Sequence, residues 1–443
     1  MGTTMHIAVI GGGLMGMSLA YFLVESGLQV TVLEQGESIG GLHAIARLDD
    51  DLIFTRYPHT ISYNDTHTLE LIRKLDLEHH LQPLTAHTGL VHQGKIYPMR
   101  SIWDLLMFRP LSLRDRLRLG QTVLQARFTR NWRALDQIPV KEWLIQVGGS
   151  PNFERIWAPL LEAKFDNRYA DVPATFIWSW LNHALNLRGE GPFKPSLAWL
   201  SHGPEVLIQT MAAAIEARGG QIQTGARVRE IEIHNQQVGR LRTYMGVLDF
   251  DAVIAAVPTP DFSRLLLSAD EAYLERLAEV RYLGLICPAL VLDRSLSDYW
   301  LLRLTDPSSP FASIIEMPCP DNPRYRIVYL PKYTAPDNDW MGVPDETIRD
   351  AWLLRLRQIF PLQLNHIKHV EVSRSRYVDP VHSLNAAEHV LAVQTPYRGL
   401  YLANASQVYP HLPTSEAVIA HARKVAAWVV REGARLAAAP TAA

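Results

Sequence analysis

The sequence predicts an α/β protein in which a Rossmann-type domain is interleaved with an α+β domain that carries a mixed or antiparallel sheet. Three observations support this fold class. A strand–helix–strand pattern with a glycine-rich turn occupies residues 6–34. Further α/β segments occur at residues 197–260 and 398–430, and the stretches between them are mainly helical or rich in sheet-like runs. The length of 443 residues also exceeds what one hydrophobic core usually holds.

Composition and charge are those of an ordinary globular protein. The formal net charge is -2, so nothing in the overall charge favours nucleic-acid binding. Cys287 and Cys319 lack the close partners that a zinc or redox motif needs, and we expect both to be buried packing residues. The chain enters a strand directly after its first residues, and no apolar run reaches the roughly 18 residues of a spanning helix. We therefore expect no signal peptide and a cytoplasmic location.

The first strand is expected at residues 6–10, which form a short apolar and β-branched run. It ends in the sequence GGGLMG, which satisfies the pattern G-x-G-x-x-G. The three glycines of this pattern have different expected roles. Gly11 makes the tight turn, Gly13 lets the backbone approach a pyrophosphate, and Gly16 lets the following helix pack closely on the strand.

The residues around this turn predict a dinucleotide site. Leu14 and Met15 belong to the helix N-terminus, whose free N–H groups would point at the phosphates. Glu34 ends the second strand and is followed by Gln35. The Glu34 carboxylate can accept hydrogen bonds from both ribose hydroxyls of an adenosine. An acid at this place disfavours NADP, whose 2′-phosphate it would repel. The motif leaves both NAD and FAD open.

A glycine doublet after the acid favours FAD. Gly40 and Gly41 lie in a loop where bare backbone can line the far side of the diphosphate. Here the sequence resembles the flavin amine oxidase, protoporphyrinogen oxidase and phytoene desaturase superfamily, to which UDP-galactopyranose mutase is also similar. The resemblance implies non-covalent FAD in contact with the doublet. The arginines that usually flank it are replaced by Ser38 and Leu42, so backbone contacts are expected there.

Three further segments carry the same resemblance. It implies that Val228 offers its backbone to the adenine, and that Ala256, in the sequence DAVIAAVPTP, lies beside the dinucleotide. Asn404 stands where the family usually has an aspartate near the ribityl chain. Thr414 or Ser415 caps the final helix, whose positive end would face the flavin N1–C2=O edge.

Together these segments predict a discontinuous domain organisation. We assign the FAD-binding domain to residues 1–50, 195–265 and 385–433, the substrate domain to residues 51–194 and 266–384, and a flexible tail to residues 434–443.

The catalytic side chains are less well defined. His59 is a candidate proton donor or substrate contact, or else a hydrogen-bonded loop histidine. Lys332 ends an apolar strand and is a candidate for the lysine that amine oxidases place near flavin N5, or else a surface lysine. Arg155, Lys164 and Arg168 would bind an anionic substrate or solvate a helix end. No metal-ligand cluster or hydrolase triad is recognised, and no metal is expected.

We therefore predict an FAD-dependent oxidoreductase that oxidises or dehydrogenates a hydrophobic or amphipathic small molecule by hydride transfer to flavin N5. Because there is no second G-x-G-x-x-G, the electrons would come from the substrate and leave to oxygen, a quinone or another acceptor. The alternatives are a non-redox sugar-nucleotide mutase, which would need paired arginines in the flavin pocket, and a non-catalytic FAD-binding protein with a closed pocket.

Residues 101–130 form a basic amphipathic segment. Trp103 and four following apolar residues precede a run that alternates leucine with arginine. Such a segment either covers the substrate domain with its arginines in water or makes a peripheral contact with a membrane surface.

Overall fold

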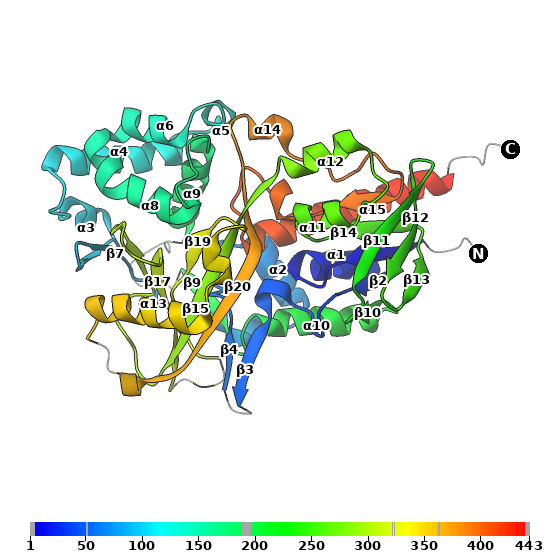
Figure 1. Ribbon diagram of the computed structural model, residues 1–443, viewed down its shortest axis with the longest axis horizontal. Helices are drawn as coiled ribbons and strands as arrows, with labels where there is room; N and C mark the ends of the chain where they lie inside the picture. Colours follow the sequence, from blue (N-terminus) through cyan, green and yellow to red (C-terminus); the bar gives the residue numbers. More distant parts are fainter. Residues whose placement is uncertain are drawn as a thin grey trace.

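The computed structural model describes residues 5–49, 52–187, 196–320, 322, 324–361 and 364–438. It has two adjoining parts (Figure 1). A parallel sheet with helices, which includes β1 (His6–Ile10) and α15 (Ser415–Ala438), lies at one end, and a mixed sheet with a group of helices lies at the other end. The long strands β15 (Arg281–Leu292) and β20 (Ile367–Val381) run between them. The predicted fold class is confirmed.

The first part is built on a five-stranded parallel sheet with the order β10–β2–β1–β14–β21. Its strands are β1 (His6–Ile10), β2 (Gln29–Leu33), β10 (Gln221–Gln223), β14 (Ala252–Ala255) and β21 (Leu400–Leu402). All five lie within the three segments that we assigned to the cofactor domain. The boundary residues of that domain stay a prediction.

One core packs four helices against this sheet. They are α1 (Leu14–Glu25), α2 (Thr66–Lys74), α10 (Glu205–Glu216) and α15 (Ser415–Ala438). Leu71 and Ile72 of α2 are buried in this core, although the first cofactor segment was predicted to end at residue 50. Helix α15 includes residues 434–438 of the predicted tail, and residues 439–443 lie outside the described residues.

Helices α2 and α15 are joined at their N-termini by one carboxylate. Glu416 of α15 accepts hydrogen bonds from the backbone N–H groups of His67 at 3.0 Å and Thr68 at 2.8 Å. The Thr68 hydroxyl also donates to Glu416, at 2.9 Å. These groups are among the N–H donors that a helix leaves without intrahelical partners, so Glu416 holds α2 in place beside α15.

A second core lies on the other side of the parallel sheet and includes Leu33, Val253 and Leu400. It is covered by three antiparallel strands and two helices: β11 (Val228–His234), β12 (Gln237–Thr243), β13 (Gly246–Asp249), α11 (Thr259–Arg264) and α12 (Glu271–Ala278).

The second part is built on a mixed sheet with the order β19–β15–β18–β17–β16–β7–β8, in which β20 also pairs with β15. All pairs are antiparallel except β16 with β7. The remaining bounds are β7 (Thr88–His92), β8 (Lys95–Pro98), β16 (Leu301–Leu304), β17 (Ser313–Pro318), β18 (Arg326–Tyr329) and β19 (Lys332–Thr334). Cys287 and Cys319 are both buried, as predicted.

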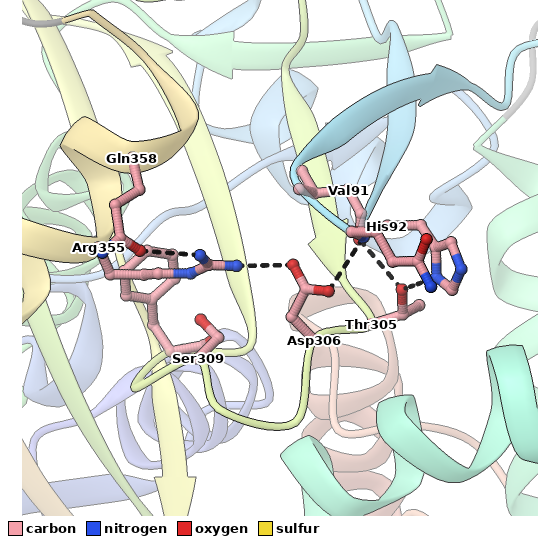
Figure 2. A network of polar contacts seen from close by, with 9 residues as sticks. Val91, His92, Thr305, Asp306, Ser309, Arg355 and Gln358 are labelled. Carbon is pink, nitrogen blue, oxygen red and sulfur yellow. Dashed lines mark hydrogen bonds and ion pairs between the residues drawn. The ribbon is translucent and has the colours of Figure 1, made fainter.

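A polar network anchors β7 and β16 to helix α13 (Asp345–Ile359) (Figure 2). Arg355 of α13 donates to Asp306 at 2.6 Å, and Asp306 also accepts from the backbone of Gln93 at 3.0 Å. Thr305 donates to the carbonyl oxygen of Val91 at 3.1 Å. These bonds fix the end of β16, which carries a residue of the cavity described below.

Helices cover the outer end of this part (Figure 1). They are α3 (Ile102–Leu106), α4 (Leu113–Phe128), α5 (Trp132–Leu135), α6 (Val140–Gly148), α7 (Ser150–Asn152), α8 (Ala158–Phe165) and α9 (Ala174–Asn186). Short elements connect the two parts: β3 (Ile45–Asp49), β4 (Leu52–Thr55), β5 (Ile61–Ser62), β6 (Leu81–Leu84), β9 (Leu197–Leu200) and α14 (Ala386–His389).

Candidate cofactor and substrate site

The first glycine turn has the geometry expected of a phosphate-binding turn. Gly11 adopts a positive φ of 107°, which disfavours any residue with a side chain. A Cβ atom at Gly16 would lie 1.9 Å from the carbonyl oxygen of Gly11, so only glycine lets α1 pack here. A Cβ atom at Gly13 would meet nothing within 4 Å. The open space at Gly13 lies at the N-terminus of α1, where Leu14 and Met15 begin the helix.

The glycine doublet lies against this turn. The backbone N–H of Gly40 donates to the carbonyl oxygen of Gly12 at 2.8 Å. Gly40 and Gly41 both have positive φ, and a Cβ atom at Gly41 would lie 3.3 Å from the Cα atom of Gly13. The two loops thus form a cradle of bare backbone at a helix N-terminus. Such a cradle fits the diphosphate of FAD without any side-chain clamp.

Glu34 is oriented by the same loops. One carboxylate oxygen accepts the backbone N–H of Gly12 and the other accepts that of Gly36, each at 2.7 Å. A carboxylate oxygen has a second lone pair, so both atoms can still accept a ribose hydroxyl. Gln35 is exposed beside Glu34, and Val228 is buried near the same end of the sheet in a core shared with Leu33.

The expected ribityl contact has a different environment from the one we predicted. The amide nitrogen of Asn404 donates to the carbonyl oxygen of Val257 at 3.0 Å and to the Thr259 hydroxyl at 3.2 Å. Its amide oxygen accepts from both the backbone N–H and the hydroxyl of Ser406. All four hydrogen-bonding positions of this amide are therefore used within the protein. Asn404 fixes the turn after β21 next to Ala256, and a ribityl contact would have to replace one of these bonds.

Two stacked histidines lie between the doublet and helix α15. The rings of His43 and His59 are 4.0 Å apart, and His59 Nε2 donates to the carbonyl oxygen of Leu42 at 2.8 Å. His43 Nε2 lies 3.3 Å from the hydroxyl oxygen of Ser415 at the first position of α15. Burial lowers the pKa of His59 to about 4 and also lowers that of His43, so both rings are neutral at pH 7. Thr414 provides the cap, since its hydroxyl accepts the backbone N–H of Ala417 at 3.3 Å.

A cavity of about 370 Å³ lies between the two parts of the molecule. Its walls are largely aromatic and aliphatic and include Trp157, Phe176 and Trp180. Thr60, Ala405 and Thr414 also line it, which brings it next to the N-terminus of α15. Thr60 also lines a small cavity of about 40 Å³ that contains His43 and His59. A larger and more polar cavity of about 650 Å³ shares His183 and residues 409–412 with the apolar one.

A lysine, an aspartate and a tyrosine form the main polar group in the wall of the 370 Å³ apolar cavity. Lys164 of α8 makes an ion pair with Asp379 of β20, and its ammonium lies 3.5 Å from the ring centroid of Tyr333. Burial is the largest single effect and disfavours the ammonium form, but the Asp379 carboxylate and Tyr333 together outweigh burial and raise the pKa of Lys164. Lys164 therefore stays cationic and is balanced by Asp379.

Lys332, the lysine candidate of the sequence, does not line the apolar cavity. Residues alternate sides along β19, so Tyr333 lines the cavity while Lys332 does not. The Lys332 ammonium lies 5.8 Å from the ring centroid of Trp340, and burial lowers its pKa. The other two basic candidates also lie elsewhere. Arg155 donates to the carbonyl oxygen of Pro110, and Arg168 lies 3.8 Å from Asp337 on the surface.

The match to known families decides the class of protein. The family described as "Flavin containing amine oxidoreductase" matches residues 14–429, which cover most of the chain. The protein belongs to this family. As a flavin-containing amine oxidoreductase it is an FAD-dependent oxidoreductase, which takes a small-molecule substrate and an electron acceptor.

Similar proteins support this assignment. The 15-cis-phytoene desaturase of Synechococcus elongatus is 24% identical over 393 residues, which cover 81% of this chain and 80% of the desaturase. A putative protoporphyrinogen oxidase from Exiguobacterium sp. 255-15 has the same fold, with a TM-score of 0.76 at 21% identity over 98% of this chain and 100% of that one. The reduced UDP-galactopyranose mutase structure aligns with a TM-score of 0.74 at 12% identity, over 97% and 96% of the two chains.

The individual cofactor contacts stay predictions, but the structure brings their residues together around the two glycine loops and the N-terminus of α15. Sequence reasoning missed His43, although it lies only two residues after the doublet. It also missed Asp379, Tyr333 and Arg303 in the cavity wall, because none belongs to a recognisable motif. Within the described residues, no helix of this oxidoreductase is long and apolar enough to cross a membrane.

Proposed function

We propose that this oxidoreductase oxidises a hydrophobic or amphipathic small molecule inside the 370 Å³ cavity. The observation that carries the proposal is the lining of that cavity: aromatic and aliphatic walls that extend to Ala405 and Thr414 beside α15. Pockets of this volume and polarity typically enclose most of the surface of a small ligand. The cavity also gives a substrate access to the cofactor region, which a non-catalytic FAD carrier would not need.

The chain's own residues would hold the cofactor at three places. The backbone of the two glycine loops would bind the diphosphate, Glu34 would bind the ribose, and the N-terminus of α15 would face the flavin ring. When bound, FAD supplies a two-electron acceptor that takes a hydride at N5. The aromatic walls would keep water away from the reacting carbon and orient the substrate.

His59 is proposed as a hydrogen-bonding residue of the site rather than a proton donor. Its ring is neutral at pH 7 because burial lowers its pKa to about 4. Its Nε2 donates to the carbonyl oxygen of Leu42, which leaves Nδ1 as an acceptor. His59 would therefore accept a hydrogen bond from the substrate side, because the burial that lowers its pKa also disfavours a protonated ring.

The mutase alternative has less support. Binding a sugar nucleotide diphosphate would require paired arginines in the pocket. Among the described residues, the apolar cavity is lined by a single arginine, Arg303, and its walls are mostly apolar. Oxidation of an apolar substrate fits this lining better.

One experiment tests these alternatives. The purified protein should show the visible spectrum of FAD, and hydrophobic substrate candidates should bleach it anaerobically, with reoxidation by oxygen or a quinone. A colourless protein that takes up no FAD would refute the proposal. A flavin that no organic substrate reduces, but that isomerises a sugar nucleotide after dithionite reduction, would favour the mutase instead.

We also propose that α3 and α4 rest on an anionic lipid surface. Six large apolar side chains are exposed on these two helices and at Met107, the residue that follows α3: Trp103, Met107, Leu113, Leu117, Leu124 and Phe128. Trp103 exposes 70% and Phe128 76% of its surface. Residues 101–130 contain six arginines and two aspartates, and both aspartates interact with the capping serines of these helices. An apolar patch with a basic surround favours anionic headgroups.

Sedimentation with vesicles tests this surface. The protein should bind vesicles of anionic phosphatidylglycerol more strongly than vesicles of phosphatidylcholine, and the triple variant W103S/L117S/F128S should lose this binding. Leu354 of α13 is similarly exposed at 64% but lies outside the patch, so L354S is the matched control and should bind normally. Equal binding by the triple variant would refute the proposal. The proposal would also be refuted if the patch only joined two copies of the chain, which size-exclusion chromatography would detect as a dimer.

A further inference from the structure

Arg303 is held in the wall of the apolar cavity by its position on β16. This strand lies between β7 and β17, where Arg303 is opposite Leu90 and Ser313. Its neighbours Leu302 and Leu304 pack into the core beneath α13. Side chains alternate along a strand, so Arg303 faces the opposite side and lines the cavity. Its guanidinium carbon lies 4.5 Å from the ring centroid of Trp180 on α9.

The charges in the cavity do not balance. Lys164 and Asp379 neutralise each other. Burial lowers the pKa of the three lining histidines, His183, His382 and His411, so they are neutral at pH 7. Burial also lowers the pKa of Arg303 to about 10, which still leaves it protonated. The ionisable groups that line the cavity therefore carry one net positive charge, on Arg303.

Arg303 also has no anionic partner within the described part of the chain. Arg355 provides a comparison: it belongs to α13, whose apolar residues pack with Leu302 and Leu304, and Figure 2 shows its contact with Asp306. Arg355 pairs with Asp306 at 2.6 Å, and both side chains are 17% exposed. A partly buried arginine normally has such a partner, because an unpaired charge is costly away from water. Arg303 keeps that cost in the resting protein, where the Trp180 ring compensates part of it.

We propose that Arg303 binds a carboxylate of the substrate, so that the preferred substrates are apolar molecules with a single carboxylate group. This inference rests on the proposed function, because it assigns the substrate class of the same cavity. One unbalanced cation matches one negative charge, whereas a phosphate would bring up to two. The planar guanidinium can also bind both carboxylate oxygens at once.

The rest of the cavity fits the remainder of such a molecule. Trp157, Leu161 and Phe176 offer an apolar surface, and the wall continues to Ala405 and Thr414 beside α15. A substrate that is fixed at one end by its carboxylate would have its apolar part confined within this space. Arg303 would then set which carbon is oxidised without taking part in the reaction.

Calorimetric titration of the purified, FAD-loaded protein tests the carboxylate site directly. The probes are decanoate, 1-decanol and decyl phosphate, which share one alkyl chain. We expect decanoate to bind about 10- to 100-fold more tightly than 1-decanol, as charge-assisted hydrogen bonds allow. R303M should bring the two affinities within about threefold of each other, mainly by weakening decanoate. Tighter binding of decyl phosphate than of decanoate would overturn the assignment to a carboxylate.

Two further variants keep the test independent of folding. R303K retains the charge but loses the planar fork, so it should show a smaller preference for decanoate than the wild type. R281Q removes an arginine that pairs with Asp171 outside the cavity and should leave all affinities unchanged. Decanoate should raise the melting temperature of the wild type but not that of R303M. An unchanged preference for decanoate in R303M and R303K would overturn the proposal.

The visible spectrum separates this inference from the proposed function. If the protein holds FAD and substrates reduce it, but decanoate and 1-decanol bind equally, the carboxylate site is refuted and the proposed function stands. If the protein takes up no FAD, the proposed function fails, and Arg303-dependent binding of decanoate to the FAD-free protein remains a separate result.

Discussion

Replacing Gly13 by alanine separates the folding role of the first glycine turn from its cofactor role. Gly13 has an ordinary extended backbone, with φ of -78°. Its added Cβ would meet no protein atom within 4 Å. The apoprotein should therefore be as stable as the wild type, or more stable by up to about 1 kcal/mol, because alanine reduces the freedom of the unfolded chain.

The cofactor should respond in the opposite way. The methyl group would occupy the open space in which we expect the diphosphate. Overpacking by one methyl group costs about 1–3 kcal/mol. We therefore expect G13A to bind FAD about 5- to 150-fold more weakly than the wild type. The assay is quenching of FAD fluorescence on rebinding to the apoprotein, combined with urea unfolding of the apoprotein.

Two other glycines provide the comparison. A Cβ atom at Gly16 would lie 1.9 Å from the Gly11 carbonyl oxygen, so G16A should destabilise even the apoprotein, by about 3 kcal/mol or more. Gly342 has the same open surroundings as Gly13 but lies in the other part of the molecule, and G342A should leave FAD binding unchanged. Wild-type affinity of G13A for FAD would show that the diphosphate does not lie at this turn.

Four further predictions follow from single contacts. E34Q removes the charge from two hydrogen bonds at 2.7 Å and should weaken FAD binding about tenfold or more in the same fluorescence assay. His59 has a pKa of about 4 in the folded protein, below its value in the unfolded chain. The unfolded state therefore binds more protons, and the free energy of unfolding should fall as the pH drops from 6.5 to 4. H59Q should remove up to about 3 kcal/mol of that fall in urea titrations at each pH, and an unchanged slope would contradict the burial of a neutral ring. D379N leaves Lys164 unpaired and should cost about 1–3 kcal/mol of stability, which the apolar pair K164M/D379L should recover in thermal melts. K332M should leave the rate of flavin reduction by substrate within about twofold of the wild type in stopped-flow traces, because Lys332 does not line the cavity.

The local features of the fold could be predicted because each depends on neighbouring residues. The apolar run before GGGLMG and the spacing to Glu34 specify the first βαβ unit almost completely. The same applies to the doublet, whose two glycines adopt the positive φ that other residues avoid. The assignment of three separate segments to one cofactor domain came through resemblance rather than through physics, and the strand order within the sheet was not predicted.

The cavity residues could not be predicted for a different reason. Arg303 belongs to a four-residue strand whose direction depends on parallel pairing with β7, more than 200 residues earlier. Lys332 and Tyr333 are adjacent, and only the pairing of β19 with β15 decides which of them faces the cavity. Helix α2 joins the first core partly through Glu416, which no local pattern connects with Thr68. In each case the decisive neighbour is distant in sequence.

The order of strands in the parallel sheet also has a consequence for biosynthesis. The central pair β1–β14 is completed by β21, and α15 covers α1, so the last forty residues are needed to build a site whose first glycine is Gly11. At about 5–20 residues per second, a ribosome takes roughly 20–80 s to make the chain between them. Until then the nascent protein exposes an apolar half-sheet and has no complete cofactor site. A chain that stops before β21 would therefore lack the last strand and the helix beside the proposed cofactor site, and it would expose apolar core residues that chaperones and proteases can recognise.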